Sequence, residues 1–235
     1  MLRALSAVQA QDCAVGRLTH LVFIDGPRPG VDAAQLQALG TRHAVQVIQL
    51  PYAVGKDGWL GHRMYGAAAF LSSSDYITYL DEDNTVDTDH ASSVLAAVAA
   101  AGLPTWGHTL RKVYDSAGAF VCVDAVDSLG TLAPTAHGAP GRRFVDTNCM
   151  FVRRDVAPLV AHGWYHRRTG ADAAVSADLC ARFPDGVCTR RFTVCYVAAS
   201  SADSNGLAHF TGPPPVREVA ELAAAAVLNT APLGD

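Results

Sequence analysis

DYITYLDEDN, residues 75–84, is the stretch that decides the fold we expect for this chain. Tyr76 to Leu80 has the aromatic, β-branched and aliphatic composition of a buried strand, and three consecutive carboxylates follow it. Asp81 and Asp83 are two residues apart, so an extended backbone sends both side chains from one face, with Cα atoms about 6.5 Å apart. That spacing suits one hard cation between the two carboxylates.

Three interpretations of this acidic cluster compete. A solvated turn with a helix cap is the first, because Asp and Asn are favoured in turns. A calcium loop is excluded, because Val86 stands where the loop needs a glycine and Ser92 where it needs a bidentate glutamate. The third is a divalent metal held by a carboxylate pair and by substrate phosphates. The residues before the strand favour this third interpretation.

Those residues predict a helix over residues 58–71. One helical stripe carries the apolar residues Leu60, Met64, Ala67, Ala68 and Leu71. A helix of about 14 residues spans about 21 Å and a strand of about 6 residues about 20 Å, so the two fit back to back as an α/β unit. His62 and Arg63 then lie at the same sheet edge as the acidic cluster, beside a helix N-terminus that attracts phosphate. Alone, such residues in a first turn are usually just solvated.

Residues 58–84 resemble a segment of the GT-A-fold glycosyltransferases of the large inverting family 2. In that family a glycine and an arginine-bearing helix precede a strand that ends in an Asp-X-Asp motif, which here reads Asp81-Glu82-Asp83. The resemblance implies a nucleotide-sugar donor, UDP-linked in our prediction, and a divalent cation (Mn²⁺ or Mg²⁺) that bridges its diphosphate. It places Asp81, Glu82, Asp83, His62 and Arg63 on the donor side, and makes Asp81 and Asp83 metal ligands.

The chain upstream of this segment predicts an α/β architecture. Helices and apolar strands alternate, which argues for a mainly parallel central sheet with helices on both faces, as in the GT-A class. The expected elements are a helix over 2–11, a strand over 21–24, a helix over 31–39 and a strand over 44–50.

Asp25 directly follows the first of these strands. In the family an aspartate at this position contacts the donor nucleoside, although Asp25-Gly26 also fits a simple turn. The family ordinarily has one more strand ahead of the helix assigned to residues 2–11. We therefore expect a late start, a fragment or a rearranged sheet.

Acceptor contacts are expected further along the chain. The stretch from 144 to 155 resembles the family's strand that shapes the acceptor pocket, which makes Asp146 and Asn148 candidate acceptor contacts. Trp164 stands where the family often has an aromatic residue near the acceptor. A structural role is at least as common for such polar residues, and buried aromatic residues outnumber exposed ones.

Asp172 is the candidate catalytic base. The family places its base in a Glu-Asp pair here, and this chain has Ala171 in the first position and retains only the aspartate. A base must be a carboxylate or histidine within reach of the acceptor hydroxyl, whereas a first-turn aspartate also suits a helix dipole. By the same resemblance His209 completes the metal shell, although a lone histidine is more often structural.

Composition limits the other classes. The 235 residues, 50% of them hydrophobic, suit one sizeable α/β domain, which we place at residues 1–212, followed by a Pro-rich break and a C-terminal helix over 213–235. That helix can pack on the domain or on a second copy. The net charge is −4 without a basic run, so nucleic acid is not an expected partner. No apolar run approaches the roughly 20 residues of a membrane span. Six cysteines without metal-binding spacing suit the cytoplasm.

The sequence thus predicts a metal-dependent, inverting glycosyltransferase. One alternative is a degenerate relative that binds a nucleotide-sugar without catalysis, to which the lone Asp172 and the expected missing strand both point. A nucleotidyltransferase is less favoured, because the glycine-rich loop with a basic residue expected after a first strand is not found. The acceptor is not identified by the sequence.

Overall fold

The structure is a computed structural model, and it describes residues 2–14, 17–133, 143–165, 170–198, 206–212 and 216–226. The helices are α1 (Leu2–Gln9), α2 (Ala33–Ala38), α3 (His62–Leu71), α4 (His90–Ala100), α5 (Ala157–Val160), α6 (His162–Tyr165), α7 (Ala171–Arg182), α8 (Leu207–Thr211) and α9 (Arg217–Ala226). The strands are β1 (Thr19–Ile24), β2 (Ala44–Gln49), β3 (Tyr76–Thr78), β4 (Thr85–Val86), β5 (Trp106–Tyr114), β6 (Phe120–Val123), β7 (Met150–Arg153) and β8 (Val187–Val197).

The strands form two sheets. A six-stranded sheet has the order β3-β7-β5-β8-β4, with β6 paired to β5, and a separate two-stranded sheet consists of β1 and β2. Among the described strands, the pairings β1–β2 and β5–β8 are parallel, whereas β3–β7, β5–β7, β5–β6 and β4–β8 are antiparallel. The predicted α/β class is confirmed, but the expectation of a mainly parallel sheet is wrong. Part of the reason is local, because the tight turn after β5 returns the chain as an antiparallel hairpin.

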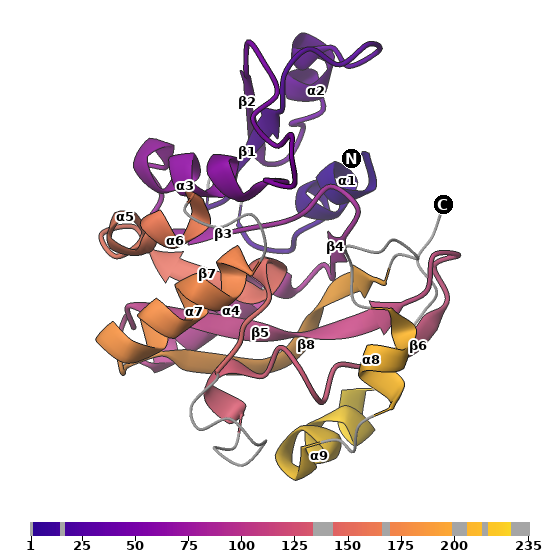
Figure 1. Cartoon of the computed structure of the whole chain (residues 1–235), viewed down its shortest axis with the longest axis vertical. Coiled ribbons are helices and arrows are strands. Elements are labelled where there is room, and N and C mark those ends of the chain that lie inside the picture. The colour runs from indigo at the N-terminus through magenta and orange to yellow at the C-terminus, as the bar shows by residue number, and fades with distance from the viewer. Residues whose placement is uncertain are drawn as a thin grey trace.

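Helices cover both faces of the large sheet, as predicted (Figure 1). Side chains alternate along β7: Met150 and Val152 join the core formed with α5, α6 and α7, whereas Phe151 packs on the other face against Val94 and Val98 of α4. These three β7 residues are at most 1% exposed. The short strand β7 is therefore buried on both faces, between α4 on one side and α5, α6 and α7 on the other.

The N-terminal unit, α1 to β2, lies beside the large sheet and has a small core of its own (Figure 1). Its buried residues are Leu5, Val22, Ile24, Leu36 and Val45. Gln11, which follows α1, connects this unit to the main body. Its side-chain amide donates to the carbonyl of Asp87 (2.7 Å) and accepts from the amide of Ala91 (2.8 Å).

Helix α3 is shorter than expected and buries a different face. It begins at His62, because Leu60 lies before it in the left-handed region (φ 49°). The predicted apolar stripe is wrong, since Leu60 is 54% and Leu71 56% exposed. The buried positions are His62, Gly66, Ala68 and Ala69. Packing against α5 and α6, which no local pattern specifies, sets this rotation of the helix.

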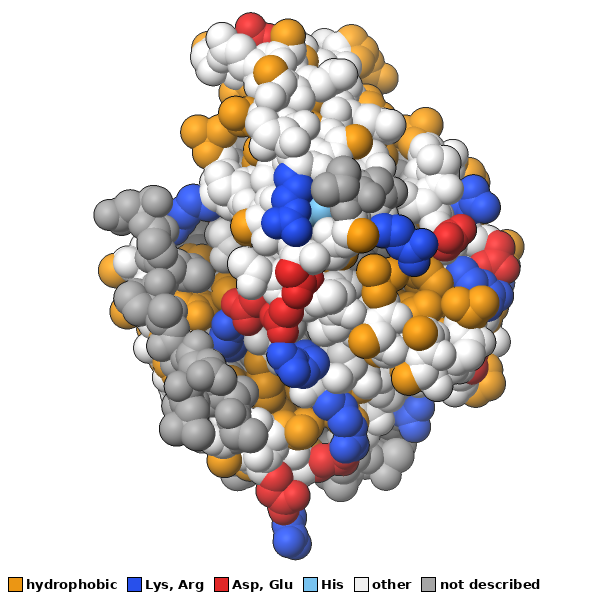
Figure 2. Space-filling model, turned by 180° about the vertical axis from the view of Figure 1, so that it is seen from behind, with side chains coloured by type: hydrophobic (Ala, Val, Ile, Leu, Met, Phe, Trp, Pro, Cys, Tyr) orange, Lys and Arg blue, Asp and Glu red, His pale blue; other side chains and the backbone are white. Residues whose placement is uncertain are grey.

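The C-terminal helix α9 packs on its own domain. Val216 and Val219 are buried together with Leu110 of β5 and Phe192 of β8. The predicted boundary after residue 212 stays a prediction, because residues 213–215 lie outside the described part of the chain. No helix in the described ranges is long and apolar enough to cross a bilayer. On the face drawn in Figure 2, Lys and Arg side chains are interspersed with Asp and Glu side chains.

Candidate functional site

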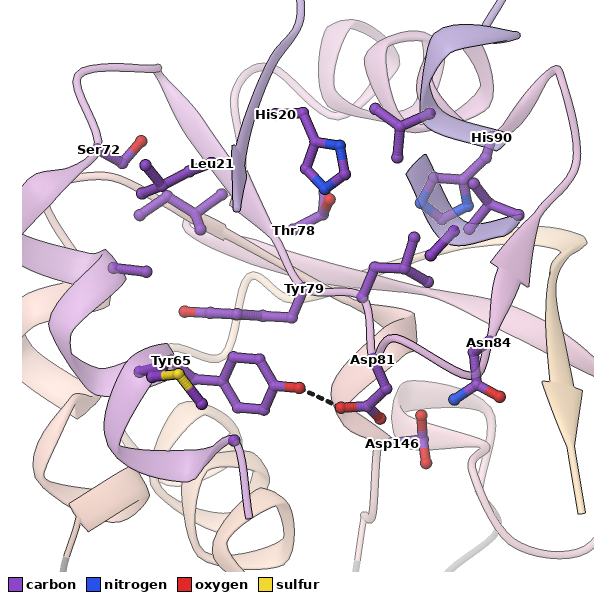
Figure 3. Close-up of a pocket in the computed structure, with 18 of the residues that line it drawn as sticks. His20, Leu21, Tyr65, Ser72, Thr78, Tyr79, Asp81, Asn84, His90 and Asp146 are labelled. Atoms are coloured by element: carbon purple, nitrogen blue, oxygen red, sulfur yellow. Dashed lines mark hydrogen bonds between the residues drawn. The ribbon is translucent and has the colours of Figure 1, made fainter. Parts of the chain in front are cut away.

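A cavity of about 2090 Å³ lies between the N-terminal unit and the edge of the large sheet. Residues of α1 and β1 line one side, and β3 with the acidic stretch lines the other, so His20 and Leu21 face Thr78 and Tyr79 across the space (Figure 3). The predicted site residues that line this cavity are Asp25, Asp81, Glu82, Asp83, Asp146, Asp172 and His209. The fold therefore gathers residues from most of the chain into one cleft.

Asp81 is held firmly in the wall of this cavity. The hydroxyl of Tyr65 donates to its Oδ1 (Figure 3), and the side-chain amide of Asn148 donates to its Oδ2 at 2.8 Å. Its backbone N–H donates in turn to Asn148 Oδ1 at 2.6 Å. Burial raises the pKa of the Asp81 carboxyl to about 6, although both hydrogen bonds oppose the shift. Both carboxylate oxygens of Asp81 thus already have a donor.

Asp83 and Glu82 lie nearer the open part of the cleft. Burial raises the pKa of Asp83, and the neighbouring charge of Glu82 adds to the shift. Glu82 forms an ion pair with Arg28 at 3.6 Å, and both side chains are at least half exposed. Arg28 comes from the turn after β1 and lines the cavity. No sequence pattern marks this arginine, apart from its position shortly after Asp25.

Asp25 lines the cavity, and its carboxylate also holds a neighbouring loop in place. Its Oδ1 accepts from the amide of Val54 (2.6 Å) and its Oδ2 from that of Gly55 (3.0 Å). A Cβ at position 55 would lie 2.7 Å from this carboxylate and 2.4 Å from the carbonyl oxygen of Leu60. Only glycine therefore fits where this loop approaches Asp25.

His62 and Arg63 do not line the cavity, contrary to the prediction. His62 is buried beside the ring of Trp164, with 6.4 Å between ring centroids. Arg63 is exposed, and its guanidinium lies 3.9 Å from the centre of the Trp59 ring and donates to the carbonyl of Val54. The rotation of α3 described above explains both positions.

The acceptor residues also differ from the prediction. Trp164 is fully buried and packs against the rings of Tyr65 and Tyr79 at 5.4 and 5.2 Å, so the prediction that it contacts an acceptor is wrong for this structure. Asp146 lines the cavity, but its carboxylate is directed at Arg111 and Asn148. Asn148 is 1% exposed and directs its amide at Asp81 and Asp146.

Arg111 is the central charge that the sequence analysis missed. Its side chain is 1% exposed, and its three nitrogens donate to Asp124 (2.8 Å), Asp127 (2.9 Å) and Asp146 (2.6 Å). The ring of Tyr196 lies 4.5 Å from the guanidinium. Burial opposes the charge, but the surrounding carboxylates outweigh burial and raise the pKa of Arg111. All nine residues of β5 are buried, so its sequence has no alternation of polar and apolar residues that would assign a role to Arg111.

Asp172 lies in the first turn of α7, as predicted, and lines the cavity. Burial, helped by the charge of Asp146, raises the pKa of Asp172 to about 7. The helix begins after Gly170, which has φ 66°, and Oδ1 of Asp172 accepts from the amide of Ala173 at 2.8 Å. A carboxylate with this pKa can take up a proton near neutral pH.

His209 contacts a different carboxylate from the one expected. Its Nε2 lies 3.4 Å from Asp127 Oδ2, on the side of the cavity that carries Arg111. Among the described residues, no group of three His, Cys, Asp or Glu side chains is close enough to hold a metal ion. The predicted metal set of Asp81, Asp83 and His209 is therefore not assembled in this structure.

No protein-family model and no curated protein matches this sequence. The structure, however, is similar to solved structures of TarS from S. aureus. For residues 1–349 of TarS in complex with UDP, the TM-score is 0.61 at 12% sequence identity, over 83% of this chain and 56% of that one. For the same fragment with UDP-GlcNAc, the TM-score is 0.60 at 12% identity, over 97% of this chain and 62% of that one.

These structural neighbours are glycosyltransferases with the GT-A fold, and the predicted GT-A architecture of this chain is confirmed. The chain spans 56% and 62% of these two TarS structures and 34% of a third structure of TarS. At 12% identity the likeness shows the arrangement of the backbone. The chemistry of the site has to be argued from its own residues.

Proposed function

We propose that this chain transfers a sugar from a UDP-linked donor to an acceptor hydroxyl, with inversion at the anomeric carbon and with the help of a divalent cation. One observation carries the proposal: within a GT-A fold, a single cavity collects Asp25, the acidic motif 81–83 and Asp172 from three distant segments. The TarS structures with UDP and UDP-GlcNAc support a nucleotide-sugar as the ligand of such a cavity.

The donor diphosphate would lie against the acidic motif. Asp83 is exposed at the cavity and forms no ion pair with another described side chain. Mg²⁺ and Mn²⁺ are commonly bound by one or two carboxylates together with substrate phosphates, so a three-residue cluster is not required. Asp83 therefore fits such a cation, which when bound would offset the charge on the leaving nucleotide. Asp81 would act as the fixed support beside it.

Arg28 is the basic residue best placed to face the phosphates. It lines the cavity, and its ion pair with Glu82 is at least half exposed on both sides, so this pair contributes little to stability. A diphosphate can therefore draw the guanidinium away from Glu82 at small cost. Asp25, which lines the same cavity, would face the nucleoside, with its carboxylate kept in place by the amides of Val54 and Gly55.

Asp172 would remove the proton from the acceptor hydroxyl as that oxygen attacks the anomeric carbon. Its raised pKa, about 7, makes the carboxylate a stronger base than an exposed aspartate while it stays substantially ionised near neutral pH. The leaving nucleotide departs on the opposite side of the sugar, which gives inversion. The six free cysteines suit a cytoplasmic site for this reaction.

A calorimetric titration with UDP, with and without Mn²⁺, tests the donor site. Binding that strengthens with Mn²⁺ is expected, followed by release of UDP from UDP-GlcNAc or another UDP-sugar in a panel of acceptors. A folded protein that binds no uridine nucleotide under either condition would refute the proposal. Binding without transfer to any acceptor of the panel would instead indicate a nucleotide-sugar-binding protein.

A further inference from the structure

Asn148 makes an unusually complete set of contacts for a buried amide. It lies in the 3-10 turn Thr147–Cys149 that leads into β7, and it is 1% exposed. Its Nδ2 donates to Asp81 Oδ2 at 2.8 Å and to Asp146 Oδ1 at 2.9 Å, and its Oδ1 accepts from the backbone N–H of Asp81 at 2.6 Å. The oxygen of the amide therefore bonds to Asp81, and its nitrogen bonds to both Asp81 and Asp146.

The chemistry of these partners fixes the orientation of the amide. A flipped Asn148 would place its NH₂ group against the N–H of Asp81 and its oxygen against two carboxylates, so both ends would repel their neighbours. Only the observed orientation gives a hydrogen-bond partner to the N–H of Asp81 and to the carboxylates of Asp81 and Asp146. The amide therefore holds the backbone and the carboxylate of Asp81 at the same time, which no single hydrogen bond could do.

The turn that carries Asn148 is itself anchored by a buried charge. Asp146 caps the turn by accepting from the backbone N–H of Asn148 at 2.9 Å, and its other carboxylate oxygen accepts from Arg111 at 2.6 Å. Arg111 is fixed in turn by Asp124 and Asp127. A continuous chain of charge-assisted hydrogen bonds thus runs from the interior of β5 to the first aspartate of the acidic motif.

We propose that Asn148 is a positioning residue, which sets the carboxylate and backbone of Asp81 so that the acidic motif can receive a metal-bound nucleoside diphosphate. This inference rests on the proposed function. It assigns Asn148 to the donor site, whereas the sequence analysis made it a candidate acceptor contact. Asp146 and Arg111 hold the turn that carries Asn148 in place. Groups outside the ligands that hold a metal site in place typically change metal affinity 10–100-fold when they are removed.

The test is the affinity of UDP with Mn²⁺ for the whole chain, measured by calorimetry. Asn148→Ala should weaken this affinity 10–100-fold. Thr193→Val is the matched control: Thr193 is 2% exposed, bonds to the ring of His90 at 2.8 Å and does not line the cavity. This control should lower the melting temperature but leave the affinity as in the wild type. Asn148→Asp keeps the side-chain shape but faces Asp81 with a carboxylate oxygen, and it replaces the alanine variant if that variant does not fold.

A double-mutant cycle with Asp81→Asn separates positioning from a general loss of structure. If Asn148 acts through Asp81, the alanine substitution should weaken UDP affinity far less in the Asp81→Asn background than in the wild type. Equal losses in both backgrounds would overturn the inference. So would an Asn148→Ala variant that binds UDP and Mn²⁺ as the wild type does. A wild-type chain that binds no UDP would instead overturn the proposed function, and this inference with it.

Discussion

Replacing Asp172 by Asn should stabilise the protein at alkaline pH while it abolishes sugar transfer. The native carboxyl has a pKa of about 7 against an ordinary value of 3.8, because burial disfavours its charged form. Between these two values the native state binds the proton and the unfolded state does not. The free energy of unfolding of the wild type therefore falls as the pH rises from about 4 to about 7. Because the asparagine cannot ionise, the free energy of unfolding of the variant does not fall in this way between pH 4 and pH 7.

The size of the effect follows from the same two pKa values. At 1.36 kcal/mol per pKa unit, the interval from 3.8 to about 7 corresponds to about 4 kcal/mol. Part of the side chain reaches the cavity, and solvent screening there reduces this to about 2 kcal/mol. For a chain of this length that amounts to a rise in melting temperature of about 4–8 °C at pH 8. The difference between variant and wild type should be smallest near pH 4.

Thermal unfolding of both proteins between pH 4 and pH 8 measures this difference. Asp178→Asn is the matched control, because Asp178 lies on the same helix and pairs with Arg182 at 2.9 Å. That variant should not gain stability at any pH. If Asp172→Asn is no more stable than the wild type at pH 8, Asp172 is not a strained, buried carboxylate and the reasoning about its pKa is wrong. UDP affinity should be unchanged in both variants, since neither residue faces the donor.

Three further predictions follow from the same geometry. First, transfer by the wild type should fall about tenfold per pH unit below about pH 7, because protonation of Asp172 removes the base; a rate that is flat from pH 5 to pH 8 would argue against this role. Second, Asp83→Ala should remove the Mn²⁺-dependent part of UDP affinity, and calorimetry that shows the same Mn²⁺ effect as in the wild type would exclude Asp83 as a ligand. Third, Arg111→Met should destabilise the fold by about 3–5 kcal/mol in urea unfolding, because it leaves three carboxylates without their shared cation; a loss below about 1 kcal/mol would contradict the buried ion network.

The sequence predicted several elements of the fold and several residues of the cleft. Apolar runs that end in a polar residue marked the strands that precede Asp25 and Asp81, and the first turn of α7 carries Asp172 as expected. These are local signals, because an apolar run of a few residues is enough to mark a strand, although β3 itself ends at Thr78, before its apolar run does. The strand β4 was missed, since two residues of pairing leave no periodic pattern.

Residue partners, by contrast, were decided by the tertiary structure. Arg111 meets Asp124 and Asp146 across 13 and 35 positions of the chain, and Asn148 meets Asp81 across 67, so no local pattern could predict these hydrogen bonds. The same holds for which residues face the cavity. Rotation of α3 against its neighbours buried His62 and left Arg63 outside the cavity.

The sequence by itself thus determined the alternation of helices and strands in the first part of the chain and the carboxylates that follow β1, follow β3 and begin α7, because hydrophobic periodicity and turn chemistry act over a few residues. Only the tertiary structure decided that a buried arginine anchors the cleft and that Trp164 belongs to the core. Burial of a charge is tolerated only where distant partners satisfy it, and those partners meet only when the chain has folded.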